Sequence, residues 1–189
     1  VIDDGEGGAI VSWEDRRGVS SDIYAQRIPY SGLGSWGPDG LAICTASGDQ
    51  IDTDIVRDGD GGAVIAWRDY RNGSWDIFSQ RVGHYSVVQW THNGVALCTE
   101  PDATRMWPTL CSDGGGGAIA AWGDSRSGLN IYAQRVERLG FWGYPSPTIT
   151  SVSDVPADQG GWVSLGFDAS RLDDGGVTLA EYSVWRSLP

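Results

Sequence analysis

The sequence predicts an all-β fold built from three copies of one four-stranded unit. The first observation is repetition, because residues 4–27 return as residues 58–81 and again as residues 113–135. The second is an alternation of apolar and polar residues, rich in β-branched and aromatic types and interrupted by Asp-Gly and Asn-Gly pairs. Such alternation is typical of half-buried antiparallel strands joined by tight turns.

The four expected strands are clearest in the second copy. The first, 54–57, is short and apolar, and the second, 62–69, is the strongest apolar run. The third, 76–82, alternates apolar and polar side chains, and the fourth, 94–99, closes the unit. Four antiparallel strands repeated at a period of roughly 40 to 50 residues are typical of a β-propeller, in which each repeat forms one blade.

The copies cover residues 1–53, 54–107 and 108–144, and the last one is incomplete. After its third strand the sequence runs into a proline-punctuated linker, and no counterpart of the fourth strand appears. Such linkers and a change of composition mark domain boundaries, so we expect one near residue 145.

Three blades in an open arrangement leave an apolar face uncovered at each end. Self-association is the simplest way to cover both faces. Two chains related by a two-fold axis would close a six-bladed ring, so we expect a homodimer.

The first 140 residues resemble the propeller repeats of large secreted bacterial proteins. They carry the pattern Asp-Gly-x-Gly-Gly-Ala, then Trp-x-Asp-x-Arg, then Asp-Ile-Tyr-Ala-Gln-Arg, with small variations between copies. The resemblance implies a propeller fold and an extracellular or cell-surface setting. It implies no activity, because propellers host many unrelated functions.

Residues 145–189 resemble the start of a bacterial fibronectin type III domain. The likeness lies in residues 149–161 and in the Tyr-x-Val-Trp-Arg segment at 182–186, and 162–168 would be the second strand. A complete domain of that type has seven strands over about 100 residues. The resemblance therefore implies a truncated fibronectin-like β-sandwich segment.

The charge of the chain narrows the classes of partner. There are 25 acidic and 13 basic residues, no lysine, and a net charge of -12. An acidic surface repels nucleic acid and anionic lipid and attracts cations, of which calcium is the natural candidate. No apolar run approaches the roughly 20 residues that span a bilayer. No signal segment opens the chain, and Val1 already lies inside a repeat, so we interpret the sequence as a piece of something longer.

Residues that recur in every copy are expected to hold the fold together. Glycines of the Asp-Gly-x-Gly-Gly turn supply positive φ, and its Asp binds its own backbone. The Trp of Trp-x-Asp-x-Arg is expected between blades, with the Asp bracing the next turn or pairing with the Arg. The cysteines Cys44, Cys98 and Cys111 are odd in number and unpaired in spacing, so we expect buried small side chains rather than disulfides or zinc ligands.

Function is expected where the copies differ. In a propeller the loops between second and third strands share one face with the loops that cross to the next blade, here 47–54 and 100–107. The carboxylates there are candidate calcium ligands, since calcium prefers oxygen donors: Asp49, Asp52, Asp54, Glu100 and Asp102. Aromatic and cationic side chains suited to a sugar or protein ligand lie on the same face: Trp75, Trp107, Arg71 and Arg105.

Three functions remain open from the sequence. The first is an extracellular module that binds a glycan or protein, with calcium assisting. The second is a calcium-dependent hydrolase of the lactonase or esterase kind, in which Asp52 or Asp102 is the candidate catalytic carboxylate. The third is a structural fragment without activity. No serine-hydrolase elbow, zinc-protease motif or phosphate loop is present, and no organic cofactor is expected.

Overall fold

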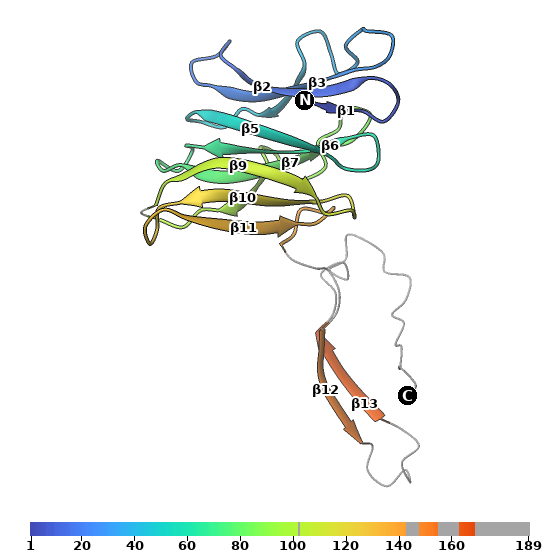
Figure 1. The fold of residues 1–189 in the computed structure, drawn as a ribbon, viewed down its shortest axis with the longest axis vertical. Coiled ribbons are helices and arrows are strands. Elements are labelled where there is room, and N and C mark those ends of the chain that lie inside the picture. The colour runs from blue at the N-terminus through green and yellow to red at the C-terminus, as the bar shows by residue number, and fades with distance from the viewer. Residues whose placement is uncertain (102, 143–147, 155–162, 169–189) are drawn as a thin grey trace. The chain divides into compact units, whose positions relative to one another are not determined.

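The computed structural model describes residues 1–101, 103–142, 148–154 and 163–168 (Figure 1). The chain divides into two compact units, Val1–Gly143 and Tyr144–Pro189. The described residues contain strands and no helix, which confirms the all-β class. Among them no helix is long and apolar enough to cross a membrane.

Three antiparallel sheets make up the first unit, and each follows the order of the chain. The first sheet contains β1 (Ile2–Asp3), β2 (Ala9–Asp15), β3 (Asp22–Ile28) and β4 (Leu41–Cys44). The second contains β5 (Gln50–Arg57), β6 (Ala63–Asp69), β7 (Asp76–Val82) and β8 (Val95–Cys98). The third contains β9 (Arg105–Ser112), β10 (Ala118–Asp124) and β11 (Asn130–Val136). Figure 1 shows the sheets as successive layers.

The strands expected at 62–69, 76–82 and 94–99 are confirmed as β6, β7 and β8. The first strand of the second sheet is longer than expected, because β5 begins at Gln50 rather than at residue 54. A β-bulge interrupts its pairing with β6 between Ile51 and Asp54. The extra residues of the bulge break the simple alternation, which is why the pattern hid the start of the strand.

The third sheet has three strands among the described residues. β11 pairs with β10 alone, and only an isolated bridge joins Val136 to Trp142 beyond it. Among the described strands, none therefore pairs with the edge of β11 that corresponds to the paired edges of β3 and β7.

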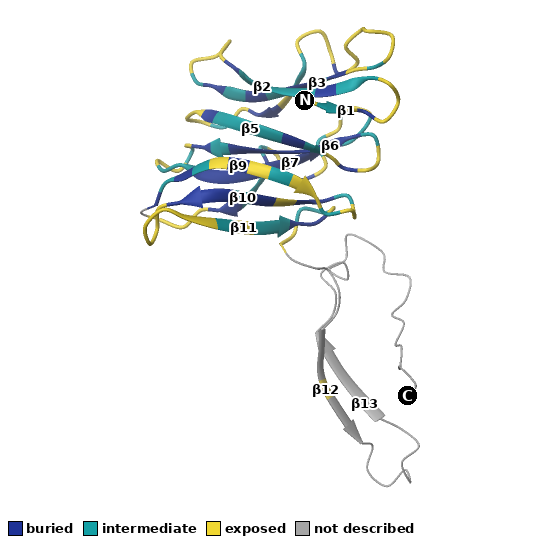
Figure 2. Ribbon diagram, viewed as in Figure 1, coloured by how far each residue is buried: buried dark blue, intermediate teal, exposed yellow. Residues whose placement is uncertain are grey.

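The core lies between the sheets, as two separate clusters (Figure 2). Ile10 and Ile23 of the first sheet pack with Ile65 and Trp67 of the second in one cluster. The other face of the second sheet forms the second cluster with the third sheet. Because successive side chains of a strand point to opposite faces, β6 contributes to both clusters.

The Trp-x-Asp-x-Arg motif forms a compact set of hydrogen bonds in each sheet. In the second sheet the Trp67 Nε1–H donates to Asp69 Oδ2 at 2.8 Å, and the Arg71 backbone N–H and Nε–H donate to Asp69 Oδ1 at 3.0 and 2.8 Å. The carboxylate of Asp69 is fully buried. Both expectations for this aspartate are confirmed, since it braces the turn and pairs with the arginine.

The Asp-Gly-x-Gly-Gly turn is organised by its aspartate in the same way. Asp58 Oδ1 accepts hydrogen bonds from the backbone N–H groups of Asp60 and Gly62 at 2.8 and 2.9 Å. The Nε–H of Arg81 donates to Asp58 Oδ2 at 2.9 Å, so the arginine that ends the repeat motif fixes the turn. Gly59 and Gly61 have φ of 82° and 78°, as expected for this turn.

Two buried cysteines connect neighbouring sheets. Arg71 of the second sheet donates to Cys44 Sγ of the first at 3.2 Å, and Arg126 of the third donates to Cys98 Sγ of the second at 2.8 Å. Burial raises the pKa of the Cys44 thiol to about 12. All three cysteines are free, and Cys111 is exposed, which corrects its expected burial.

The second unit contains one described pair of strands, β12 (Thr148–Asp154) and β13 (Val163–Asp168), which pair antiparallel. The strand expected at 162–168 is confirmed over 163–168. The segment at 182–186 lies outside the described residues, and the fibronectin-like identity stays a prediction.

Replacing Asp69 by alanine should lower the free energy of unfolding by about 3–5 kcal/mol, because a buried arginine-carboxylate pair loses one partner. The measurement is urea denaturation followed by tryptophan fluorescence. Asp39→Ala is the control, since Asp39 is 77% exposed and lies 3.6 Å from Arg17, and its loss should stay below about 1 kcal/mol. Equal losses in the two variants would contradict this account.

Acid should destabilise the protein partly through Asp124. Hydrogen bonds from the Arg126 side chain, followed by those from its backbone, hold the pKa of Asp124 well below its usual value. The unfolded chain therefore takes up this proton first, and the free energy of unfolding should fall as the pH drops below about 5. Asp124→Asn should show a shallower fall than the wild type between about pH 5 and 2. Asp39→Asn should keep the wild-type slope, and equal slopes for all three proteins would count against Asp124.

Candidate functional site

The crossing loops and the loops between second and third strands meet at one end of the sheets, which we call the loop face. The Ser21 N–H donates to Asp49 Oδ1 at 2.9 Å, and the Tyr70 N–H donates to the Asp49 carbonyl at 2.9 Å. At the next junction the Arg105 N–H donates to the Trp75 carbonyl at 3.1 Å. These bonds connect neighbouring sheets, so the loop face is one continuous surface.

A polar cavity of about 450 Å³ opens on the loop face between the first two sheets. Its lining includes Arg16, Ser20, Ser21, Asp49, Ile51 and Trp75. Residues with hydroxyl, carboxylate and guanidinium groups thus line the same cavity as one large aromatic residue. This combination suits a ligand that offers both hydroxyl groups and an apolar face.

The ring of Trp75 is held in place from the protein side. The guanidinium of Arg68 lies 4.4 Å from the ring centroid of Trp75, and the Tyr70 ring lies 5.0 Å away at a tilt. A cation above the ring face and a neighbouring aromatic ring both favour a fixed orientation. Trp75 is therefore a preorganised part of the cavity wall.

Arg68 is itself fixed by hydrogen bonds to residues of other strands. Its Nη1–H donates to Asp52 Oδ2 at 2.8 Å, and its Nε–H donates to the carbonyl of Arg105 at 2.8 Å. The backbone N–H of Asp52 donates to a carboxylate oxygen of Glu14 at 2.9 Å. Sequence reasoning missed Arg68 and Glu14, although they occupy the one variable position inside the otherwise repeated Trp-x-Asp motif.

The described acidic residues expected to bind calcium are not gathered around one point, and three of them have their own partners in the protein. Asp49 holds the Ser21 backbone, Asp52 pairs with Arg68, and Asp54 accepts from the backbone N–H of Leu110 at 2.8 Å. Glu100 is exposed, and Asp102 lies outside the described residues. Among the described residues no group of three or more His, Cys, Asp or Glu side chains is gathered for a metal.

The two arginines expected at a ligand site are occupied within the protein. Arg105 is fully buried, and its guanidinium bonds Asp76 at 3.0 Å and Asp124 at 3.2 Å. Arg71 pairs with Asp69 and lies 3.8 Å from the ring centroid of Phe78. Both guanidinium groups therefore hold strands and sheets together. Arg105 aligns with Gln50 in the repeats, and the structure buries both side chains completely.

Trp107 combines exposure with an unusual backbone conformation. It is 67% exposed and has a φ of 54°, in the bulge that interrupts the pairing of β9 with β10. Asp52 has the same position in β5 and a φ of 53°. Bulky residues rarely adopt this left-handed conformation, and such strain concentrates at functional positions. Trp107 is thus a second candidate contact for a ligand.

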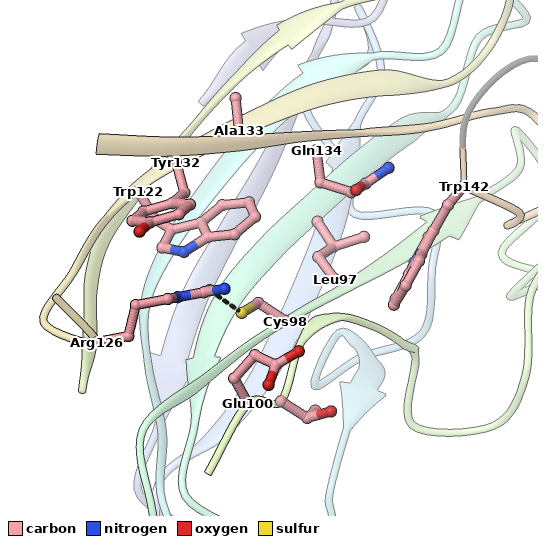
Figure 3. Close-up of a pocket in the computed structure, with 10 residues that line it drawn as sticks. Leu97, Cys98, Glu100, Trp122, Arg126, Tyr132, Ala133, Gln134 and Trp142 are labelled. Atoms are coloured by element: carbon pink, nitrogen blue, oxygen red, sulfur yellow. Dashed lines mark hydrogen bonds between the residues drawn. The ribbon is translucent and has the colours of Figure 1, made fainter. Parts of the chain in front are cut away.

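A second cavity of about 210 Å³ lies beside the edge of β11 that pairs with no described strand (Figure 3). Leu97 and Cys98 of β8 line one side, and Tyr132 and Gln134 of β11 line the other. In the sheets that have a fourth strand, the position of Ala133 is paired, as Ser79 is with Val95. The second cavity therefore lies along the edge that the fourth strand covers in the other two sheets.

No family model, no curated protein and no solved structure matches this chain. The features that bear on function are therefore those of the chain itself, namely its loop face and the two cavities.

Replacing Trp107 by glycine should give a more stable protein than replacing it by alanine, by about 1 kcal/mol. Both changes remove the ring, but only glycine adopts the left-handed conformation without steric cost. Urea denaturation of the two variants measures the difference directly. An alanine variant as stable as the glycine variant would show that the conformation at this position relaxes.

Proposed function

We propose that residues 1–143 form a β-propeller type of module in an extracellular protein, and that its loop face binds a glycan. The repeated antiparallel sheets and the resemblance to secreted bacterial repeats support the architecture and the setting. The acidic surface, with a net charge of -12 for the chain, favours neutral ligands over polyanionic ones.

The observation that carries the proposal is Trp75 in the polar cavity. Its ring is braced by Arg68 and Tyr70, while Asp49, Ser20 and other polar groups line the same space. Sugars present an apolar ring face for stacking and hydroxyl groups around its edge for hydrogen bonds. The cavity offers a complement to both.

The same geometry favours binding over hydrolysis. Asp52, a candidate catalytic carboxylate of the hydrolase, is engaged by the guanidinium of Arg68. A carboxylate in such a pair accepts charge-assisted hydrogen bonds from the protein, and this competes with a role as catalytic base or nucleophile. Calcium stays part of the proposal as an aid to ligand binding, and Asp49 is the candidate ligand that lines the same cavity as Trp75.

The test uses the full chain and a panel of neutral and acidic oligosaccharides, with affinity measured by titration calorimetry. We expect binding of a neutral member, and Trp75→Ala should weaken it at least about tenfold, which corresponds to about 1.4 kcal/mol. Tyr85→Ala is the matched control, because Tyr85 is an aromatic residue, 83% exposed, in the loop between β7 and β8.

Each titration is run with calcium and with a chelator, and weaker binding in chelator would support the assisting ion. Undiminished affinity in Trp75→Ala, or the absence of binding across the panel, would overturn the proposed function.

A further inference from the structure

One face of the third sheet exposes apolar side chains that are buried in the other two sheets. The repeats align Ile131 of β11 with Ile23 of β3 and Ile77 of β7. Ile23 and Ile77 are 0% exposed, whereas Ile131 is 76% exposed. Ile119 of β10 is likewise 39% exposed, although its counterparts in β2 and β6 are fully buried. The difference arises because no further sheet among the described residues of the first unit covers this face.

The chain contains two contacts between sheets, and the same types of residue cover the buried isoleucine in each. Ile23 belongs to the cluster that contains Ile65 and Trp67 of the next sheet. Ile77 belongs to the cluster that contains Ala120 and Trp122 of the next sheet. A β-branched face from one sheet thus meets a tryptophan-bearing face from the next, twice in succession.

The first sheet carries a tryptophan-bearing face that no other sheet formed by the described residues of the first unit covers. Val11, Trp13 and Tyr24 occupy the positions of Ile65, Trp67 and Phe78 and are partly exposed. The rings of Trp13 and Tyr24 stack at a centroid distance of 6.2 Å. Figures 1 and 2 show that β2 and β3 lie at the opposite end of the layers from β10 and β11.

We propose that the outer face of the third sheet binds the outer face of the first sheet of a second copy of this chain. The contact would continue an interface that the chain already forms twice, with Ile119 and Ile131 on one side and Val11, Trp13 and Tyr24 on the other. Two such contacts related by a two-fold axis close a dimer of six sheets, in which no face of this kind stays uncovered. The inference concerns assembly and does not depend on the proposed glycan site.

Charge adds a further expectation. Two copies that each carry a net charge of -12 repel one another, and salt screens that repulsion. The apolar faces supply the attraction, which salt does not weaken. The dimer should therefore strengthen as the ionic strength rises.

The experiment measures the mass of the full chain by sedimentation equilibrium at several concentrations. We expect twice the 20.2 kDa mass of one chain, and the mass of one chain for Ile131→Asp. Leu33→Asp is the matched control, because Leu33 is also 76% exposed but lies in the loop between β3 and β4, and it should stay dimeric. Circular dichroism and urea midpoints near the wild-type values show that the variants are folded.

A mixing experiment tests which faces meet. Val11→Asp alters the other face and should also have the mass of one chain. Mixing it with Ile131→Asp should restore a dimer, because one contact then joins two unaltered faces. A monomeric wild type, open polymers that grow with concentration, a dimeric Val11→Asp variant, or a mixture that stays monomeric would overturn the proposal.

Discussion

The architecture depends on one buried carboxylate at the end of the second strand of each sheet. Asp15, Asp69 and Asp124 each accept a hydrogen bond from the Trp indole two residues earlier and from the Arg two residues later. The same carboxylate therefore orients a ring in an apolar face and fixes the loop that follows. In the second and third sheets the paired arginine also reaches a cysteine of the preceding sheet. Ring, loop and neighbouring sheet are thus positioned by a single anion.

Features that recur along the chain could be predicted from the sequence, because each depends on residues close together in the chain. This holds for the alternating strands, for the glycine turns and for the Trp-Asp-Arg set. The buried position of Arg105 could not be predicted in this way, since its partners Asp76 and Asp124 come from two different sheets. The early start of β5 was hidden for a related reason, because a bulge interrupts the alternation that marks a strand.

The sequence could predict the aromatic residue of the candidate site but not the side chains that hold it in place. Trp75 stands out as an unrepeated aromatic residue in a loop, but nothing near it in the sequence indicates its support by Arg68. That support depends on a position that differs in every repeat, occupied by Glu14, Arg68 and Gly123. Glu14 and Arg68 both contact Asp52, from neighbouring sheets. The variable residue inside the repeated motif thus makes the loop face differ from one sheet to the next.

The two faces of each sheet are complementary to each other and different from each other, and this gives the stack a direction. A repeat inserted between two others meets a tryptophan-bearing face on one side and a β-branched face on the other, as its neighbours do. Duplication or deletion of a repeat can therefore lengthen or shorten such a protein without creating a mismatched junction. Each added sheet also brings its own variable position to the loop face, so growth of the scaffold and diversification of its surface proceed together.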